Sequence, residues 1–374
     1  MSGRPLRILL TTDLVGGVWS YTVTLANALA ARGHALLVAV VGEMDASRAT
    51  ELSPGIPVEA KPLRLEWMRG GSADQAVGAE WLATLVREWG ADLIHLNQFS
   101  YAAFPLGAPT LVVGHSDVLS WWSEVRGATA PAEWERYAAQ VRRGLEAADL
   151  VVTPSRYQSR LLERHYGRGA DRVVPNGVDV SDPEERREEG RETSILTAGR
   201  AWDPAKDVAT LDAALGILGD DAPPAVLLGD TTDPEGGDVS FRRLRVEGRR
   251  PPAEVRARMR RSALYVAASR YEPFGLAPLE AALEGCALLL SHIGSFRELW
   301  DGCAAFFPPG DAQALAAEIR RLEGDPPRRR ELAEAAGRRA RERFGVERTA
   351  NEYLDLYRTL IPAHAPVMHP TPTR

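Results

Sequence analysis

Two glutamates flank a short glycine-containing loop in the second half of the chain. Glu272 and Glu280 enclose Phe274-Gly275-Leu276, which follows a stretch with the pattern of a buried strand. If a helix begins at that loop, its free N–H groups can face phosphate oxygens. Glu280, about one turn into the helix, could accept two hydrogen bonds from a ribose diol, with Glu272 nearer to a group carried by the phosphates. The pattern indicates a site for a phosphorylated nucleoside; the alternative is two exposed acids that favour a helix N-terminus.

Two cations precede this region, at Arg200 and Lys206. Arg200 stands at the end of an expected strand, and Lys206 stands at the expected start of the next helix. A forked guanidinium and a compact ammonium there would hold a diphosphate and could neutralise a leaving nucleotide without a metal ion. The 45 basic residues include only two lysines, the other being Lys61. That rarity argues against the alternative of two solvated surface cations.

A glycine pair, Gly16-Gly17, follows the first expected strand. Glycines there let the backbone approach a ligand closely and present N–H groups to a phosphate. The alternative is a tight strand-to-helix turn without a ligand. The spacing matches neither the nicotinamide-binding G-x-G-x-x-G turn nor a G-x-x-x-x-G-K-[ST] phosphate loop, which argues against both of those site classes.

Apolar runs alternate with amphipathic segments along the whole chain, which predicts an α/β fold with parallel sheets covered on both faces. Ligands of such sheets bind at the carboxyl ends of the strands, where the residues above would lie. The expected strands are 6–12, 35–41, 92–96, 110–113, 150–153, 173–174, 194–198, 225–228, 264–268 and 287–291. The expected helices are 20–32, 79–89, 131–147, 156–166, 205–218, 253–261 and 276–284, with three more up to about residue 360.

With 374 residues, the chain is long enough for two domains. The pattern breaks after 173–174, at Pro175-Asn176-Gly177-Val178-Asp179 and the charged segment 182–192, and then restarts. We therefore expect an N-terminal Rossmann-like domain over 1–178 and a C-terminal Rossmann-like domain over 179–345. The proline-containing segment 362–374 is expected to be a disordered tail.

Composition excludes several classes of protein. No apolar run is long enough for a membrane span, and the N-terminus lacks the pattern of a secretory signal, so the default expectation is a cytoplasmic location. A net charge of −6 without a long basic block argues against a nucleic-acid partner. Cys286 and Cys303 form neither a disulfide framework nor a metal-spaced set, and we expect both to be small buried residues.

Several strings together resemble a known family. Glu272 and Glu280 look like the E-x7-E signature of retaining glycosyltransferases of the GT-B fold, family 4 in the usual sequence classification. The string 272–281 is similar to that family's E-x-F-G-L-x-x-L-E-A, and Gly199-Arg200 with Lys206 resembles its G-R…K phosphate clamp. Gly16-Gly17 matches its N-terminal glycine loop. Thr153-Pro154-Ser155 and the string 175–179 resemble two further family strings, so the resemblance covers roughly residues 6–360.

The resemblance implies a fold of two Rossmann-like domains that face each other across a cleft. It also implies metal-independent transfer of a hexose-type sugar from a nucleotide-diphosphate sugar to an acceptor hydroxyl, with no further cofactor. Helix 346–361 would return to the N-terminal domain. The roles implied for the individual side chains are diphosphate binding by Arg200 and Lys206, ribose binding by Glu280, contact with the donor sugar by Glu272, closure over the phosphates by Gly16 and Gly17, and a place near the reaction centre for His115.

The chain departs from the family pattern in a few places. Asp207 follows the clamp lysine where the family usually has glycine, and we expect this acid beside the phosphates to weaken the clamp. Cys286 replaces a common proline, Trp202 falls inside the clamp loop, and 294–298 only partly matches a glycine-rich loop. From the sequence alone, His115 could equally be a core or loop histidine. None of these departures removes a proposed catalytic group.

Two other functions fit the same pattern: a nucleotide-sugar 2-epimerase, and a nucleotide-sugar-binding module without turnover. UDP is the default nucleotide of the donor. The acceptor stays open among a sugar, a lipid-linked molecule and a small natural product, with at most peripheral membrane contact. The first half is rich in tryptophan, and aromatic rings stack on sugars, although packing is the commoner role. These tryptophans include Trp19, Trp67, Trp121 and Trp122.

Overall fold

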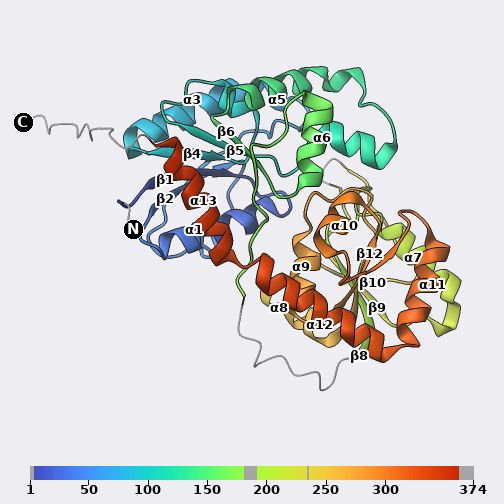
Figure 1. The fold of residues 1–374 in the computed structure, drawn as a ribbon. Coiled ribbons are helices and arrows are strands. Elements are labelled where there is room, and N and C mark those ends of the chain that lie inside the picture. The colour runs from blue at the N-terminus through green and yellow to red at the C-terminus, as the bar shows by residue number, and fades with distance from the viewer. Residues whose placement is uncertain (1–3, 181–191, 234–235, 362–374) are drawn as a thin grey trace, which may run out of the picture.

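The computed structural model describes residues 4–180, 192–233 and 236–361, and it contains two parallel sheets (Figure 1). The first sheet has seven strands in the order β3 (Val58–Lys61), β2 (Ala35–Val41), β1 (Arg7–Thr12), β4 (Leu93–Leu96), β5 (Thr110–Val113), β6 (Leu150–Thr153) and β7 (Arg172–Val173). The second has six, in the order β10 (Arg245–Gly248), β9 (Ala225–Leu228), β8 (Glu192–Ala198), β11 (Ser262–Ala267), β12 (Ala287–Ser291) and β13 (Ala305–Phe307). The expected α/β class is confirmed.

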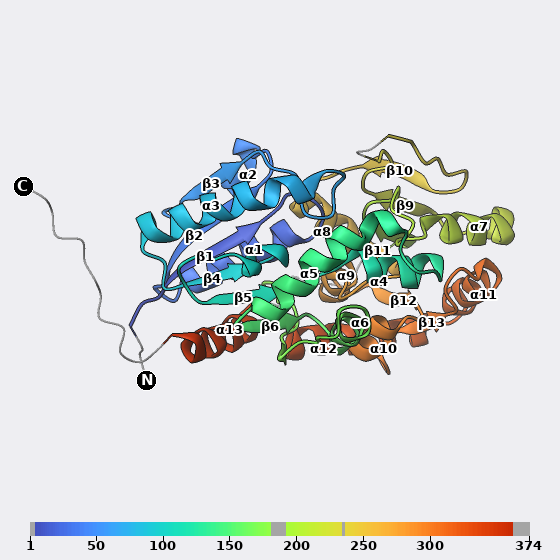
Figure 2. The same cartoon turned by 90° about the horizontal axis from the view of Figure 1, so that it is seen from above.

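Helices cover both faces of each sheet, and the two domains lie side by side (Figure 2). In the first half the helices are α1 (Val18–Ala30), α2 (Ala46–Ala49), α3 (Gly71–Trp89), α4 (Val118–Trp121), α5 (Glu135–Ala147) and α6 (Arg156–Tyr166). In the second half they are α7 (Val208–Leu218), α8 (Pro252–Arg261), α9 (Leu276–Leu283), α10 (Gly294–Trp300), α11 (Ala312–Glu323), α12 (Pro326–Arg343) and α13 (Val346–Leu360). A π-helical turn over 122–126 follows α4 directly.

The central strands are buried on both faces because their residues alternate between two apolar layers. In β1, Ile8 and Leu10 pack in the layer that contains α1, whereas Leu9 packs in the layer with α3 and α5. In β8, Ile195 packs in the layer with α7 and α11, and Leu196 packs in the layer with α9 and α12. Each domain therefore has its own core on both faces of its sheet.

Helix α13 lies in the first domain, although it follows the helices of the second (Figure 1). Its residues Ala350, Tyr353 and Tyr357 are buried in the layer that contains α1. The chain returns to the first domain beside Val178, which forms a parallel bridge with Gly345. Two chain segments thus connect the domains. The charged segment 182–192 falls almost wholly, and the tail 362–374 wholly, outside the described residues.

Several local predictions were wrong, each for a physical reason. Helix α7 begins at Val208 rather than 205, because Asp207 has a left-handed backbone (φ 45°), so Lys206 lies in the preceding loop. Helix α3 begins eight residues before the expected start, in a glycine-containing segment where Gly78 packs against the Tyr101 ring. The sequence pattern missed the edge strands β3, β10 and β13, of which β3 and β10 include charged residues. Four described helices, not three, follow β12.

Candidate active site

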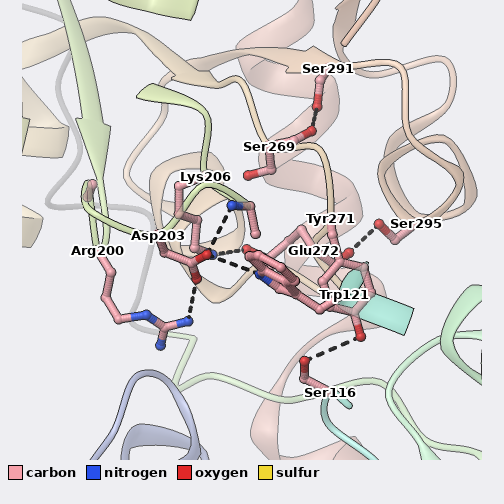
Figure 3. A network of polar contacts seen from close by, with 12 residues as sticks. Ser116, Trp121, Arg200, Asp203, Lys206, Ser269, Tyr271, Glu272, Ser291 and Ser295 are labelled. Atoms are coloured by element: carbon pink, nitrogen blue, oxygen red, sulfur yellow. Dashed lines mark hydrogen bonds and ion pairs between the residues drawn. The ribbon is translucent and has the colours of Figure 1, made fainter. Parts of the chain in front are cut away.

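Loops that follow the strands of both sheets meet between the domains (Figure 3). Ser155, which caps α6, donates a hydrogen bond to the Pro273 carbonyl (2.7 Å). Ser116, after β5, donates to the Tyr271 hydroxyl (3.3 Å). The carboxyl ends of the strands of both domains therefore face one another, which is where ligands of parallel sheets bind.

Arg200 lies against the glycine loop of the first domain. Its guanidinium donates to the Asp203 carboxylate (3.0 Å), and its side chain is one-third exposed. A Cβ atom built on Gly16 would lie 2.0 Å from an Arg200 nitrogen, and Gly16 has a φ of 75°. Glycine is favoured there because the backbone is left-handed, and a side chain would also displace the Arg200 guanidinium. The Gly16 loop and the proposed phosphate clamp are thus in direct contact across the domain boundary.

The second glycine of the loop approaches the start of α9. A Cβ atom on Gly17 would lie 3.2 Å from the Leu276 methyl group. Gly275 caps α9 with a φ of 90°, and Phe274 before it is buried in the core. The loop expected to face phosphates is therefore positioned by a buried anchor on one side and by the first domain on the other.

Lys206 forms an ion pair with Glu272, and both side chains are mostly buried (Figure 3). Lys206 comes from the loop between β8 and α7, and Glu272 from the loop after β11. These strands are neighbours in the sheet, so their carboxyl ends bring the two loops together. The structure therefore joins the clamp lysine to the glutamate expected to contact the donor sugar.

The two predicted cations lie around one buried acid, Asp203. Burial alone would raise the pKa of this carboxyl, but the charges of Arg200 and Lys206, with a backbone hydrogen bond from Ala205, hold it below the usual value. Asp203 also accepts a hydrogen bond from the Trp121 indole of the first domain (3.2 Å). Asp203 was part of the quoted clamp string, but its role as the partner of Arg200 was missed.

Glu280, on α9, has an unusual environment. Burial raises its pKa to about 7, with Arg256 lowering it and Glu284 raising it. Its carboxylate accepts no hydrogen bond from any residue that the structure describes. Burial also raises the pKa of Tyr265 in β11, and the charges of Glu272 and Glu280 raise it further. Both glutamates therefore act on the Tyr265 hydroxyl, and Glu272 also pairs with Lys206.

His115 lies at the end of β5 and its ring is fixed by Asn97. The Asn97 amide nitrogen donates to the Thr11 carbonyl (2.7 Å) and to Thr22, so its oxygen faces His115 Nε2 (2.9 Å). This nitrogen must therefore carry the proton, which leaves Nδ1 as an acceptor. Burial lowers the pKa of His115 to about 3, so the imidazole is neutral. Ser116 follows His115, and Tyr271 precedes Glu272. The hydrogen bond between Ser116 and Tyr271 therefore joins the segments that carry His115 and Glu272.

Asp207, the departure from the family's glycine, does not present a free acid to the clamp. Its carboxylate accepts hydrogen bonds from Arg270 (2.9 Å) and Thr210 (2.8 Å). The expectation that it weakens the clamp overlooked these partners. The backbone at Asp207 is left-handed, which gives a physical reason why the family usually has glycine at this position.

The remaining predicted features have structural roles. Cys286 and Cys303 are both buried, as expected. Trp19 is a core residue that donates to Glu51, whereas Trp67 is 38% exposed.

No helix in the described part of the chain is long and apolar enough to cross a bilayer.

A cavity of about 520 Å³ borders the clamp loop. It is lined by Trp202, Asp203 and Phe241 from the second domain and by Val125 and Arg126 from the first. Its lining includes neither Lys206 nor the acidic pair. The cavity is therefore next to the loop that carries Arg200 and Lys206.

Comparison with known proteins identifies similar sequences and folds. The model described as Glycosyltransferase Family 4 matches residues 15–182, and that described as Glycosyl transferases group 1 matches 242–342. The phosphatidyl-myo-inositol mannosyltransferase of Mycobacterium tuberculosis is 27% identical over 379 residues, covering 95% of this chain and 96% of that protein. The same enzyme of Mycolicibacterium smegmatis is 28% identical over 356 residues, covering 87% and 86%.

Two solved structures show the same fold over nearly their whole length. The sucrose-phosphate synthase of Thermosynechococcus elongatus superposes with a TM-score of 0.76 at 22% identity, covering 96% of this chain and all of that one. The Anabaena protein HepE, solved with UDP and glucose, gives a TM-score of 0.73 at 21% identity, covering 95% and 100%.

Proposed function

This chain belongs to glycosyltransferase family 4 and has the GT-B fold, and on that premise we propose that it moves a hexose-type sugar from a nucleotide-diphosphate sugar to an acceptor hydroxyl with retention of anomeric configuration. The observation that carries the proposal is the convergence of Arg200, Lys206, Glu272 and Glu280 where the domains meet. The mannosyltransferase names of the relatives support a hexose as the transferred group.

In the proposed donor complex, Arg200 and Lys206 bind the diphosphate and the start of α9 presents N–H groups to it. Lys206 exchanges the Glu272 carboxylate for a phosphate oxygen, which leaves Glu272 beside the sugar. Glu280, which has no partner among the described residues, accepts hydrogen bonds from the ribose diol. Gly16 and Gly17 close the site from the first domain.

The proposed reaction breaks the bond between the anomeric carbon and the diphosphate while the acceptor oxygen bonds to the same face of that carbon. The electron pair of the broken bond passes to the diphosphate, which also takes the acceptor proton. Arg200 and Lys206 stabilise the charge that develops on the leaving group, so the chain's own cations supply what a metal ion would. His115 is neutral and offers Nδ1 as a hydrogen-bond acceptor at the reaction centre.

The decisive experiment begins with calorimetric titration of UDP, GDP and ADP, with UDP as the first candidate. The matching glucose and mannose donors are then incubated with acceptors, and the product's anomeric configuration is determined by NMR. We expect one diphosphate to bind and the product to keep the donor's configuration. Failure of all three nucleotides to bind would contradict the proposal. A C2-inverted sugar formed without acceptor would indicate an epimerase, and binding without transfer or hydrolysis would indicate a binding module.

A further inference from the structure

Tyr271 belongs to the second domain, but its side chain is buried against the first. It lies in the loop after β11, directly before Glu272, and is 3% exposed. The backbone N–H groups of Arg270 and Tyr271 donate to the Ala205 carbonyl of the clamp loop (2.8 and 3.5 Å). The ring packs in an apolar cluster with residues of the first domain: Val125, Tyr157 and Leu161. The backbone of Tyr271 is therefore fixed to the clamp loop, while its side chain extends into the other domain (Figure 3).

The Tyr271 hydroxyl uses both its proton and its oxygen for hydrogen bonds to the first domain. Gln158 Nε2 donates to the Asp117 carboxylate (3.0 Å), so Gln158 Oε1 is the end of the amide that faces Tyr271. The Tyr271 hydroxyl therefore donates to Gln158 Oε1 (3.0 Å), and its oxygen accepts from the Ser116 hydroxyl (3.3 Å). Gln158 is completely buried. Removing the Tyr271 hydroxyl would thus deprive a buried amide oxygen of this donor, which is unfavourable.

The first turn of α6, which carries Gln158, is itself held by the second domain. The Arg156 and Tyr157 N–H groups donate to the two carboxylate oxygens of Glu298 on α10 (2.8 Å each). N–H groups in the first turn of a helix have no partner within the helix, so an acid of the other domain completes this end of α6. The residue that accepts the Tyr271 proton is therefore fixed relative to the second domain.

The contacts of Tyr271 connect two residues that the proposed reaction places at its centre. Ser116 directly follows His115 in the first domain. Tyr271 directly precedes Glu272, whose carboxylate pairs with Lys206 in the second domain. One hydroxyl group therefore links the segment that carries the imidazole to the loop that carries the acid. The proposed nucleotide site lies mostly on the second domain, so this link bears on transfer more than on nucleotide binding.

We propose that the Tyr271 hydroxyl is a positioning group for the transfer step, which fixes the His115 segment relative to Glu272. Its proton and its oxygen are both used within the protein, so it acts through Ser116 and Gln158 rather than on a substrate. This inference rests on the proposed transferase function, because it assigns a part in that reaction to a residue that the donor chemistry does not use.

The first test replaces Tyr271 by phenylalanine, which keeps the ring in its apolar cluster and removes only the hydroxyl. We expect kcat to fall at least about 10-fold, the scale of one lost hydrogen bond to a group that stays buried. We expect the Kd for UDP, GDP or ADP, whichever binds, to change less than about threefold, because Lys206 and Glu280 keep their places in the second domain. A smaller fall in kcat, or an equal loss of nucleotide affinity, would overturn the inference.

Tyr166→Phe is the matched control, because it removes a hydroxyl from the same hydrogen-bond network. Tyr166 is also 3% exposed, and it donates to the Asp117 carboxylate (2.9 Å) that accepts from Gln158. Its bond lies wholly within the first domain. Both variants should therefore lower Tm, but only Tyr271→Phe should lower kcat. An equal fall in kcat in the two variants would assign Tyr271 a structural role only and would overturn the inference.

The second test is a double-mutant cycle, which asks whether Tyr271 acts through Ser116. Ser116→Ala and Tyr271→Phe remove the two ends of one hydrogen bond. The double variant should therefore lose no more of its kcat than Tyr271→Phe alone. Losses that multiply in the double variant would show that the two side chains act independently, which would also overturn the inference.

The third test needs no substrate and follows the His115 ring signals by NMR in the free protein. We expect Tyr271→Phe to shift these signals and Tyr166→Phe to leave them unchanged, because only the Tyr271 hydroxyl bonds to Ser116 in this comparison. Unchanged His115 signals in Tyr271→Phe would overturn the inference. A wild type that binds no nucleotide would instead contradict the proposed function, and the NMR comparison would still decide whether Tyr271 fixes His115. The two failures are therefore distinguishable.

Discussion

Lys206 and Glu272 form an ion pair between the loops that follow two neighbouring strands, β8 and β11. Each of these residues therefore holds the other in place before any ligand binds. In the proposed donor complex, a phosphate oxygen competes with this carboxylate for Lys206, and the sugar meets a glutamate whose counter-ion is shared or lost. The proposal thus connects binding of the leaving group to the charge presented to the transferred group.

Replacing Lys206 by alanine should reduce turnover by at least about 100-fold, the scale of one lost donor to a developing charge. Lys61→Ala is a matched control, because Lys61 is the chain's other lysine and ends the edge strand β3. Steady-state assay of both variants with the same donor checks the prediction. Near-normal turnover in Lys206→Ala would reject the clamp.

Glu272→Gln and Glu280→Gln should change nucleotide affinity in opposite directions. Removing the Glu272 charge frees Lys206, so UDP should bind about threefold more tightly while turnover falls. Removing the Glu280 charge weakens the acceptor for the ribose diol, so UDP should bind more weakly. Calorimetric titration measures both effects, and a change of the same sign in both variants would contradict the assigned roles.

The raised pKa of Glu280 should make the free protein less stable as the pH rises from about 4.5 to about 7. Within that window the folded chain keeps a proton that the unfolded chain has released, so raising the pH favours unfolding. Glu280→Gln should therefore exceed the wild type in free energy of unfolding by about 2 kcal/mol at pH 8, and by much less at pH 4.5. Urea denaturation at the two pH values checks this; equal differences at both would count against a buried, unpaired carboxyl.

His115 should stay neutral throughout the physiological range, because its pKa is lowered to about 3 by burial. Its ring signals in an NMR titration should therefore not move between pH 5 and pH 8. Asn97→Leu should remove the partner of Nε2 and permit the other tautomer, with a loss of turnover larger than the loss of nucleotide affinity. A His115 titration near pH 6.5 in the wild type would show that the ring is not held in this way.

Asp207 permits a test of backbone strain with two variants that lose the same carboxylate. Both Asp207→Gly and Asp207→Ala remove the bonds to Arg270 and Thr210, but only glycine adopts a φ of 45° without strain. The alanine variant should be about 1 kcal/mol less stable than the glycine variant. Urea denaturation of the pair gives the difference, and equal stabilities would mean that the loop rearranges.

Much of the fold could be predicted because its central strands are continuous apolar runs. Strands β2, β5 and β12 have the expected bounds, and α6 begins after its Ser155 cap as expected. The edge strand β3 was not predicted, because a half-exposed strand with charged residues lacks a continuous apolar run. The left-handed Asp207 could not be read from the sequence, and it moved the start of α7.

Lys206 and Glu272 meet because the loops that carry them follow the neighbouring strands β8 and β11. The sequence could not show which of them pair with one another. Asp203 binds Arg200 three residues away in the same loop, but it also binds Trp121, which comes from a distant segment of the first domain. Such relationships depend on packing between domains, which local patterns do not encode.

The position of α13 also bears on how the protein is made. Tyr357, near the end of this helix, forms a hydrogen bond with His95 of β4 (2.7 Å), so α13 completes the core of the domain that is synthesised first. During translation, the N-terminal half lacks the apolar contacts of α13 until that helix has left the ribosome. All the described strands of the second domain precede α13 in the chain, so they have emerged before it. We therefore expect the half that emerges last to fold first, and the nascent N-terminal half to be the one that depends on chaperones.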